Sequence, residues 1–416
     1  SASSVVNPFI AAMSAPAIVL TTGTFMRGLM HTGEAKTPGG RHGEGAAHAV
    51  SDALRALGFE LGRLKTGTPP RFKSGSIDFS VMDQQDGDNP PRKFSFWKSE
   101  ITLPQVPCFL TYTNEEMHRR IRENLSKSPL YSGHIKGIGP RYCPSIEDKV
   151  VKFPEKPAHH LFFEPESLES DWIYPNGIST SLPAEVQELF VRAIPGCENV
   201  IFTRYGYAVE YDCIDPTQLS HTLEMKQIAG LYFAGQTNGT SGYEEAAAQG
   251  ILAGINAALK VLGRPSLKLS RENSYIGVMV DDLVTLGVSE PYRMFTSRAE
   301  YRLVLREDNA DLRLSGIAQE LGLLSQDQQH LYSERKRKLT VLKTYLHRTI
   351  VKPSEKLPIK TAQPAAVLLK RPELGLDDLA KAIPDFPTDL LDEASVETTE
   401  LEIKYEGYAS IQHEEI

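Results

Sequence analysis

The chain has 416 residues, of which 41% are hydrophobic and 24% charged, a composition typical of a globular protein and not of a disordered or fibrous one. Its length predicts two or three domains, since single hydrophobic cores stop growing near roughly 250 to 300 residues. No apolar run approaches the about 20 residues that a membrane span requires. The net charge of −8 means that nucleic acid could be bound only through local basic patches.

The first predicted elements belong to an α/β domain. Residues 17–20 form an apolar run before Thr21-Thr-Gly-Thr24, which predicts a buried strand ending in a glycine turn, as in a parallel sheet. Apolar residues at helical spacing predict a helix over 46–58, with Gly58 at its C-cap. Residues 71–183 are rich in proline and turn residues, and they contain one clear periodic helix, at about 114–125. This stretch is interpreted as an inserted mixed α+β domain.

The α/β pattern resumes after the insertion. Residues 230–235 predict another buried strand, and 241–262 predict a long helix. Beyond Asp281 the pattern is helical, with candidates at 318–324, 328–348 and 374–383 and a proline- and lysine-rich loop at 352–364. The predicted fold class is therefore α/β, with a doubly wound domain, an inserted α+β domain and an all-helical C-terminal domain. The predicted boundaries are 1–70, 71–183, 184–265 and 266–416.

A glycine-rich loop between the strand at 230–235 and the following helix is the first candidate site. It places Gly235, Gln236, Asn238, Gly239 and Gly242 at the start of the helix. Ser241 and Glu244 have the spacing of a capping box, which predicts a helix end that suits a phosphate or the electron-rich edge of a flavin. The alternative is a purely structural turn that packs the helix on the strand.

A second candidate loop surrounds Cys143 in the sequence Gly139-Pro-Arg-Tyr-Cys-Pro-Ser-Ile-Glu-Asp148. Prolines on both sides of the cysteine disfavour a helix and predict a rigid loop. The neighbouring guanidinium of Arg141 favours the thiolate that nucleophilic attack requires. The alternative is that this cysteine is a small buried apolar residue. The four cysteines are too scattered for a disulfide framework, and the dispersed histidines predict no metal site.

A third candidate is an arginine-rich tract that carries Arg293, Arg298, Arg302 and Arg306. If the tract is helical, the last three lie at i, i+4 and i+8 and form one stripe. Tyrosine and phenylalanine residues interleave with them, a combination suited to phosphate pairing and base stacking. The alternative is a solvated face paired with nearby carboxylates. The run Glu334-Arg-Lys-Arg-Lys338 is interpreted as a solvated helix face.

Five segments taken together closely resemble the MnmG (GidA) family. They occur in family order along the chain, at residues 62–71, 139–148, 174–183, 233–250 and 291–298. The resemblance implies a homodimeric FAD-binding subunit that works with an MnmE-type GTPase partner on tRNA. It also implies addition of an aminomethyl-type group to C5 of uridine 34, with FAD, NADH and methylene-tetrahydrofolate. The tract 21–28 resembles the mitochondrial, fungal-like branch, which implies a mitochondrial protein; the bacterial cytoplasm is the alternative.

The resemblance also assigns roles to individual residues. Gln236 matches a flavin-contacting position, and Cys143 matches a functionally essential cysteine. The segment 139–153 matches the family's NAD(H) segment, which brings Gly139, Arg141, Tyr142, Ser145 and Glu147 into the cofactor-binding set. A thiolate at Cys143 could add to C6 of uracil and raise the nucleophilicity of C5, while a structural or proton-transfer role stays open.

Three departures from the family pattern are visible. The glycine motif that opens an FAD-binding unit and a second important cysteine are expected upstream of Ser1, and Ala47 stands where the family has a serine that contacts FAD. The family is also expected to continue through further helices after Ile416. Two rival functions follow: a folate- and FAD-dependent tRNA uridine methyltransferase, and a non-catalytic RNA-binding scaffold. The residues after Asp281 argue against the first, which lacks a long helical C-terminal domain.

Overall fold

A computed structural model describes residues 14–97, 100–141, 144–354, 357 and 359–415. The chain divides into two compact units. The first comprises residues up to Arg92 together with Thr102–Lys268 and Met279–Met294, and the second comprises Lys93–Ile101, Leu269–Val278 and Phe295–Ile416. Among the helices of these described ranges, none has the length and apolar character needed to cross a membrane.

A parallel strand pair and a long helix confirm the predicted α/β elements of the first unit. Strand β1 (Ile18–Leu20) pairs in parallel with β12 (Leu231–Phe233), although more than two hundred residues separate them. A short 3-10 helix η5 (Gly235–Asn238) follows β12 and leads to α5 (Tyr243–Val261), which contacts both strands. Burial under α5 accounts for the apolar run of β12, whereas β1 is less buried than predicted, since Ile18 is 47% exposed and the other two residues are half-buried.

A four-stranded antiparallel sheet lies in the same unit. Its strand order is β3 (Ala35–Pro38), β2 (Leu29–Thr32), β11 (Tyr207–Ile214) and β4 (Leu61–Thr68). Helix α1 (His48–Ala56) lies within the predicted range 46–58. Strand β11 is buried along almost its whole length, including the polar residues Glu210 and Asp212. Buried charges on a central strand require partners, and Asp212 pairs with Arg55 and Arg63 at 2.9 Å each.

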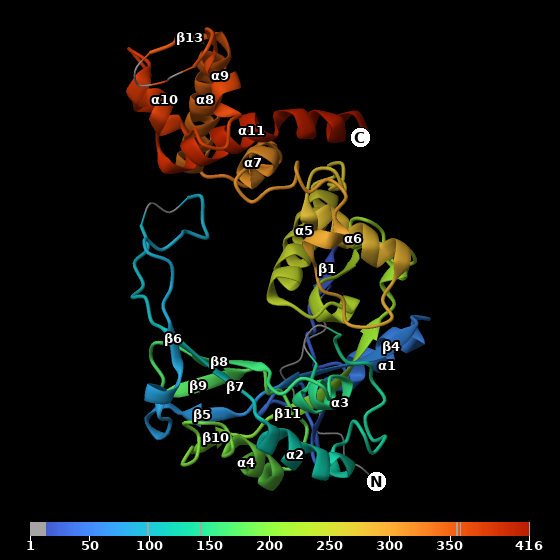
Figure 1. Ribbon diagram of the computed structural model, residues 1–416. Helices are drawn as coiled ribbons and strands as arrows, with labels where there is room; N and C mark the ends of the chain where they lie inside the picture. Colours follow the sequence, from blue (N-terminus) through green and yellow to red (C-terminus); the bar gives the residue numbers. More distant parts are fainter. Residues whose placement is uncertain (1–13, 98–99, 142–143, 355–356, 358, 416) are drawn as a thin grey trace. The chain divides into compact units, whose positions relative to one another are not determined.

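The inserted domain is built on a six-stranded antiparallel sheet (Figure 1). Its strands, in spatial order, are β10 (Phe202–Arg204), β5 (Arg71–Lys73), β9 (Trp172–Asn176), β8 (His160–Pro165), β7 (Cys108–Tyr112) and β6 (Asp83–Gln85). Three helices share its hydrophobic core: α2 (Glu115–Glu123), α3 (Ile146–Lys152) and α4 (Ala184–Val191). The predicted mixed α+β character of the insertion is confirmed.

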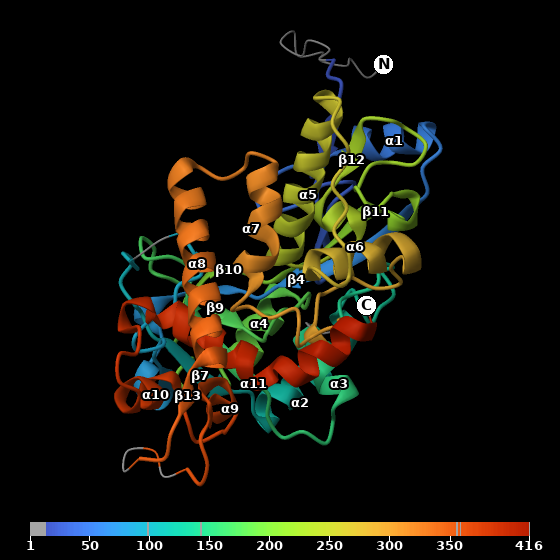
Figure 2. The ribbon, with the colours of Figure 1, turned by 90° about the horizontal axis from the view of Figure 1, so that it is seen from above.

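The second unit is mainly helical. Its longest helix is α8 (Gln326–Arg348), which packs against α7 (Ala310–Glu320), α9 (Ala365–Leu369) and α11 (Glu393–Glu415), and Figure 2 shows α7 and α8 side by side. Helix α10 (Leu376–Ala382) shares their core. The chain also forms α6 (Tyr275–Leu286) and a two-residue strand pair, β13 (Ile350–Val351) with β14 (Gln363–Pro364). The predicted α/β fold class is confirmed, with this strand pair as an addition to the helical C-terminal region.

Two local predictions are wrong. The helix predicted at 318–324 is α7, which begins at Ala310 and ends at Glu320. Its buried face carries the polar residues Asp311 and Ser315, which obscure the apolar period. The loop predicted through 139–148 gives way to α3 at Ile146, because Pro144 precedes the N-cap Ser145 and so does not interrupt the helix.

Candidate functional site

The glycine-rich loop lies where two neighbouring parallel strands end. Strand β1 leads to Thr22 and β12 leads to residues 234–239, and the amide of Ala234 donates to Leu20 O at 3.0 Å. The crevice outside the carboxyl ends of parallel strands is the usual place for ligands in open α/β sheets. Gly235 and Gly239 have φ of +87° and +82°, a left-handed conformation that favours glycine.

Gln249 of α5 holds this loop in place. Its side chain is fully buried, and Oε1 accepts hydrogen bonds from Asn238 Nδ2 at 2.8 Å and from the Gly235 amide at 3.2 Å. Nε2 donates to Thr240 Oγ1 at 3.0 Å. A buried amide that uses both its donor and acceptor groups fixes the loop conformation. The sequence analysis did not single out Gln249, although a polar residue on the buried face of an apolar helix is a signal of this kind.

The predicted capping box at Ser241 and Glu244 is wrong. Helix α5 begins at Tyr243 with Gly242 as its N-cap, and no side chain caps it. The buried carboxylate at this end belongs instead to Glu245, whose Oε1 accepts from Arg293 Nε at 3.1 Å and from the Met294 amide at 2.8 Å. A β-carbon at Gly242 would lie 1.7 Å from Glu245 Oε2, so the space beside this glycine is already occupied by the protein's own carboxylate. A β-carbon at Gly239 would likewise lie 2.5 Å from Val288 Cγ2.

Two buried polar atoms at the loop fit a bound cofactor. Thr22 Oγ1 after β1 and Asn238 Oδ1 after β12 have no hydrogen-bond partner within the described part of the chain, and buried polar groups are normally paired. They flank the carboxyl ends of the two parallel strands, where the edge of a flavin could supply donors or acceptors. The half-buried Gln236 lies in the same loop. Ala47, the N-cap of α1, has no side-chain hydrogen bond to offer.

A buried His–Glu pair anchors the approach to the Cys143 region. Glu210 Oε2 lies 2.9 Å from His31 Nε2, and Oε1 accepts from the amides of Lys136 at 2.9 Å and Gly137 at 2.7 Å. Burial alone would raise the pKa of Glu210, but these hydrogen bonds and the charge of Arg63 lower it to about 2. The ionised carboxylate therefore ties residues 136–137 to the four-stranded sheet.

The predicted NAD(H) segment is distributed over surface and core. Gly139 lies against Lys65, since a β-carbon there would be 3.2 Å from Lys65 Cδ, and Arg141 is exposed. Tyr142 and Cys143 lie outside the described residues. Ser145 is buried and caps α3 by accepting from the Asp148 amide at 3.3 Å.

Glu147 is fully buried and already has partners of its own. Its Oε1 accepts from Thr180 Oγ1 at 3.0 Å and from the Ser181 amide at 3.1 Å, which ties α3 to the segment before α4. Oε2 has no hydrogen-bond partner among the residues that the structure describes. The contacts of Glu147 and Ser145 are structural ones, and the exposed side of the segment is the part around Gly139 and Arg141.

The three described cysteines contrast with an activated nucleophile. Burial raises the pKa of the Cys197 and Cys213 thiols to about 12, and it also raises the pKa of the half-buried Cys108. None of these three thiols is therefore a thiolate at neutral pH. Within the described ranges, no group of three or more His, Cys, Asp or Glu residues could hold a metal ion.

The predicted arginine stripe does not form. Residues 296–298 make a single 3-10 turn and 299–309 are turns and bends, so Arg298, Arg302 and Arg306 do not share a helix face. Arg306 pairs with Asp308 at 2.9 Å, which is the intramolecular pairing named as the alternative. Arg293 pairs with Glu245, whereas Arg302 is exposed. The turns in this stretch are held by local hydrogen bonds, such as the one that Asn309 Nδ2 donates to Val304 O at 3.1 Å.

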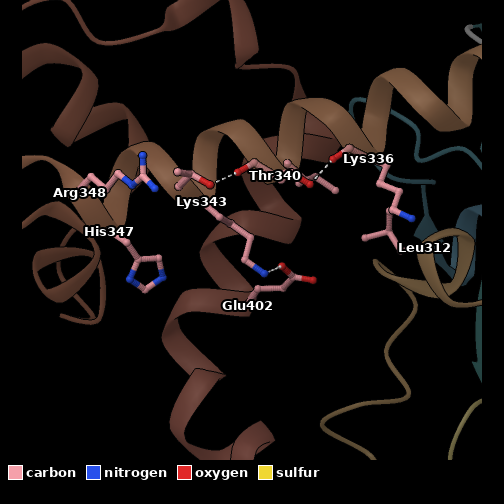
Figure 3. A pocket seen from close by; sticks show the side chains of 9 residues that line it. Leu312, Lys336, Thr340, Lys343, His347, Arg348 and Glu402 are labelled. Atoms are coloured by element: carbon pink, nitrogen blue, oxygen red, sulfur yellow. Dashed lines mark hydrogen bonds and ion pairs between the residues drawn. The ribbon is translucent and has the colours of Figure 1, made fainter.

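The C-terminal helices form a basic groove of about 520 Å³ (Figure 3). One face of α8 lines it with Lys336, Lys343, His347 and Arg348. Lys343 pairs with Glu402 of α11 at 2.7 Å, and Figure 3 shows this pair across the groove. The run 334–338 is only partly a solvated face, because Arg335 is drawn inward to Asp311 at 2.5 Å. Sequence analysis did not identify this groove, since its lining depends on how α8 meets α11.

Comparison with known families covers both units. The family described as "Glucose inhibited division protein A" matches residues 2–265, and "tRNA modifying enzyme MnmG/GidA C-terminal helical domain" matches residues 326–413. The chain belongs to the GidA family. It is 53% identical over 410 residues to the tRNA uridine 5-carboxymethylaminomethyl modification enzyme MnmG of Thermodesulfovibrio yellowstonii and 50% identical over 409 residues to that of Geobacter sulfurreducens.

Each of these GidA-family relatives is longer than the chain. The alignments cover 96% of this chain and 65% of each relative. Two crystal forms of Aquifex aeolicus GidA have the same fold, with a TM-score of 0.85 and identities of 46% and 48%, and they match 96% of this chain. The chain covers 64% and 65% of those two structures. All of these relatives are bacterial.

Proposed function

We propose that this GidA-family chain is the FAD-dependent subunit of an enzyme that adds an aminomethyl-type group to C5 of the wobble uridine 34 in tRNA. The observation that carries the proposal is at least 50% identity, over nearly the whole chain, to proteins named tRNA uridine 5-carboxymethylaminomethyl modification enzyme MnmG. Since the chain spans 65% of those relatives, the activity is proposed for the full-length protein.

Gly235, Gln236 and Asn238 would hold the flavin, which supplies the redox step when bound. The unpartnered Asn238 Oδ1 supports this role, and Gln249 keeps the loop in the binding conformation. Gly239 and Gly242 support the loop by making room for Val288 and Glu245. NADH and methylene-tetrahydrofolate are the proposed co-substrates. A flavin spectrum in the full-length protein would distinguish this enzyme from a non-catalytic scaffold.

Cys143 is the proposed nucleophile. Its thiolate would form a bond to C6 of uracil, and the electron pair of the C5–C6 double bond would shift towards the O4 carbonyl, leaving C5 nucleophilic. C5 would then form a bond to the methylene carbon of methylene-tetrahydrofolate, and the C–N bond that breaks would leave its electron pair on the folate nitrogen. Loss of the C5 proton and expulsion of the thiolate would then restore the C5–C6 double bond. The high pKa values of the other three thiols support the choice of Cys143 by contrast.

The test is nucleoside analysis of uridine 34 by mass spectrometry in cells that lack the native protein. Full-length wild type and Cys108→Ser, a control on strand β7, should restore the C5 substituent. Cys143→Ser should not, although it should fold, bind FAD and lose no more than about 1 kcal/mol of stability. Normal modification by Cys143→Ser would refute the catalytic role. An unchanged nucleoside in cells without the protein would refute the proposed function itself.

Arg302 and the basic groove on α8 are the proposed contacts to tRNA phosphates. Arg302 is the better site for charge reversal, because reversing Arg306 would also break its pair with Asp308. Arg302→Glu should weaken tRNA binding and reduce its salt dependence by about one counterion. Equal affinity and equal salt slope for wild type and a folded Arg302→Glu variant would exclude this contact.

A homodimer and an MnmE-type GTPase partner complete the proposed assembly. Light scattering of the full-length protein tests the first, and co-purification with the GTPase from the same organism tests the second. The bacterial relatives favour the bacterial cytoplasm over the mitochondrion as the compartment.

A further inference from the structure

Lys65 is a buried lysine that lacks a counter-charge of its own. It lies in strand β4 with 3% of its surface exposed, and its ammonium group makes no hydrogen bond or ion pair to the residues that the structure describes. The carboxylate of Glu210 lies directly opposite in the strand register, on the same face of the sheet. The oxygens of that carboxylate are engaged with His31 and with the amides of Lys136 and Gly137.

A lysine in this position contributes little to folding, because its side chain is buried and its ammonium group makes no hydrogen bond or ion pair to a described residue. Burying a charge costs free energy unless it is paired, and an apolar side chain of similar volume would be better tolerated. The position therefore fits a group that acquires its counter-charge from a bound anion.

The surroundings of Lys65 fit a phosphate. Gly139 packs on its aliphatic stem, with the added β-carbon position 3.2 Å from Cδ, and the exposed Arg141 follows two residues later. Gly137 approaches the β4 backbone so closely that a β-carbon would lie 2.9 Å from Leu64 O. Glu210 fixes this glycine segment beside Lys65. A lysine and an arginine are groups that recognise phosphate, whereas the Gly137 amide already donates to Glu210 and serves to hold the segment in place.

We propose that Lys65 binds a phosphate group of a dinucleotide at the Gly139 segment. The identification of that dinucleotide as NADH rests on the proposed function. Lys65 lies in the segment 62–71, and the residue pattern of that segment predicts no ligand for it. Its link to Gly139 comes from the tertiary fold, which brings residues 136–139 alongside β4.

The test compares two reductants of the flavin in the full-length holoprotein. NADH carries a pyrophosphate, whereas dihydronicotinamide riboside delivers the same hydride without any phosphate. Under anaerobic conditions, Lys65→Met should raise the apparent Kd for NADH about 10- to 100-fold, the range expected for a lost charge-assisted hydrogen bond. Reduction by the riboside should be unchanged. Lys36→Met, on an exposed strand of the same sheet, should alter neither.

Two controls distinguish a loss of NADH binding from a loss of folding: the measured stability of Lys65→Met and a second variant, Lys65→Arg. Lys65→Met should unfold no more easily than wild type, because it keeps the buried aliphatic stem and removes no hydrogen bond or ion pair to a described residue. Lys65→Arg should retain NADH affinity better than Lys65→Met, and equal losses in the two variants would overturn the proposal. Unchanged NADH affinity in Lys65→Met would also overturn it, as would an equal loss with both reductants. Loss of FAD from a stable Lys65→Met protein would overturn the assignment to NADH. Failure of the proposed function would look different, because NADH would not reduce the wild-type flavin.

Discussion

Replacing Gly242 with alanine should destabilise the first unit, because the added methyl group would meet a buried carboxylate. The new β-carbon would lie 1.7 Å from Glu245 Oε2 and 2.9 Å from Arg293 Nε. Glu245 is only 3% exposed, so its carboxylate has little room to move away. Its hydrogen bonds to Arg293 and to the Met294 amide would be lost or weakened. Hydrogen bonds to charged groups contribute about 1.5 to 3 kcal/mol each, which predicts a loss of about 3 kcal/mol in the free energy of unfolding.

The same helix offers a matched control. A β-carbon at Gly250 would meet no atom within 4 Å beyond its chain neighbours and the backbone of its own helix. Gly250→Ala should therefore raise the free energy of unfolding by about 0.5 to 1 kcal/mol through the usual cost of glycine in a helix. Urea unfolding followed by far-UV circular dichroism measures both variants. The two alanine substitutions should therefore shift the midpoint in opposite directions.

A double-mutant cycle between Gly242 and Glu245 identifies the cause of the destabilisation by Gly242→Ala. If the clash with the carboxylate is responsible, Gly242→Ala should cost less than about 1 kcal/mol in a Glu245→Ala background. A Gly242→Ala protein as stable as Gly250→Ala would refute the steric argument. A full cost that persists without Glu245 would place the conflict elsewhere. Either way, loss of flavin from a Gly242 variant is weak evidence for a ligand contact, since the substitution first disturbs the protein's own ion pair.

Three further measurements test the buried polar network. Because the pKa of Glu210 falls from its ordinary 4.5 to about 2, Glu210→Gln should cost at most about 3 kcal/mol at neutral pH. That difference is fully present above about pH 4.5 and should vanish as the pH falls towards about 2; a pH-independent difference would contradict the linkage. Gln249→Leu should lower stability by about 2 to 4 kcal/mol and reduce FAD content in the full-length protein, and wild-type FAD content would exclude a positioning role. Arg335→Met should destabilise the helical unit by about 3 to 5 kcal/mol by leaving Asp311 buried and unpaired, whereas Lys336→Met should change stability by less than about 0.5 kcal/mol.

The local pattern of apolar residues was sufficient to predict much of the secondary structure. Apolar runs and helical spacing predicted β1, β12, α1, α5 and α8, because each element buries one face or is buried on all sides. The same patterns separated the α/β elements from the inserted and helical regions. Prediction failed where the buried face is polar, as in α7, or where a proline only marks the start of a helix, as at α3.

The pattern of apolar and glycine residues along the chain predicted many of the elements, their order and the glycine-rich loop after β12. It could not assign partners to the charged residues that matter at the candidate site. Glu210 meets His31 across 179 positions, and Glu245 meets Arg293 across 48. Lys65 reaches Gly139 only because residues 136–139 lie along β4. The contact between Glu245 and Arg293 depends on how α5 packs against a separate loop. The contacts of His31, Lys65 and Glu210 depend on strand register, because a one-residue change of register would turn each of these three side chains to the opposite face.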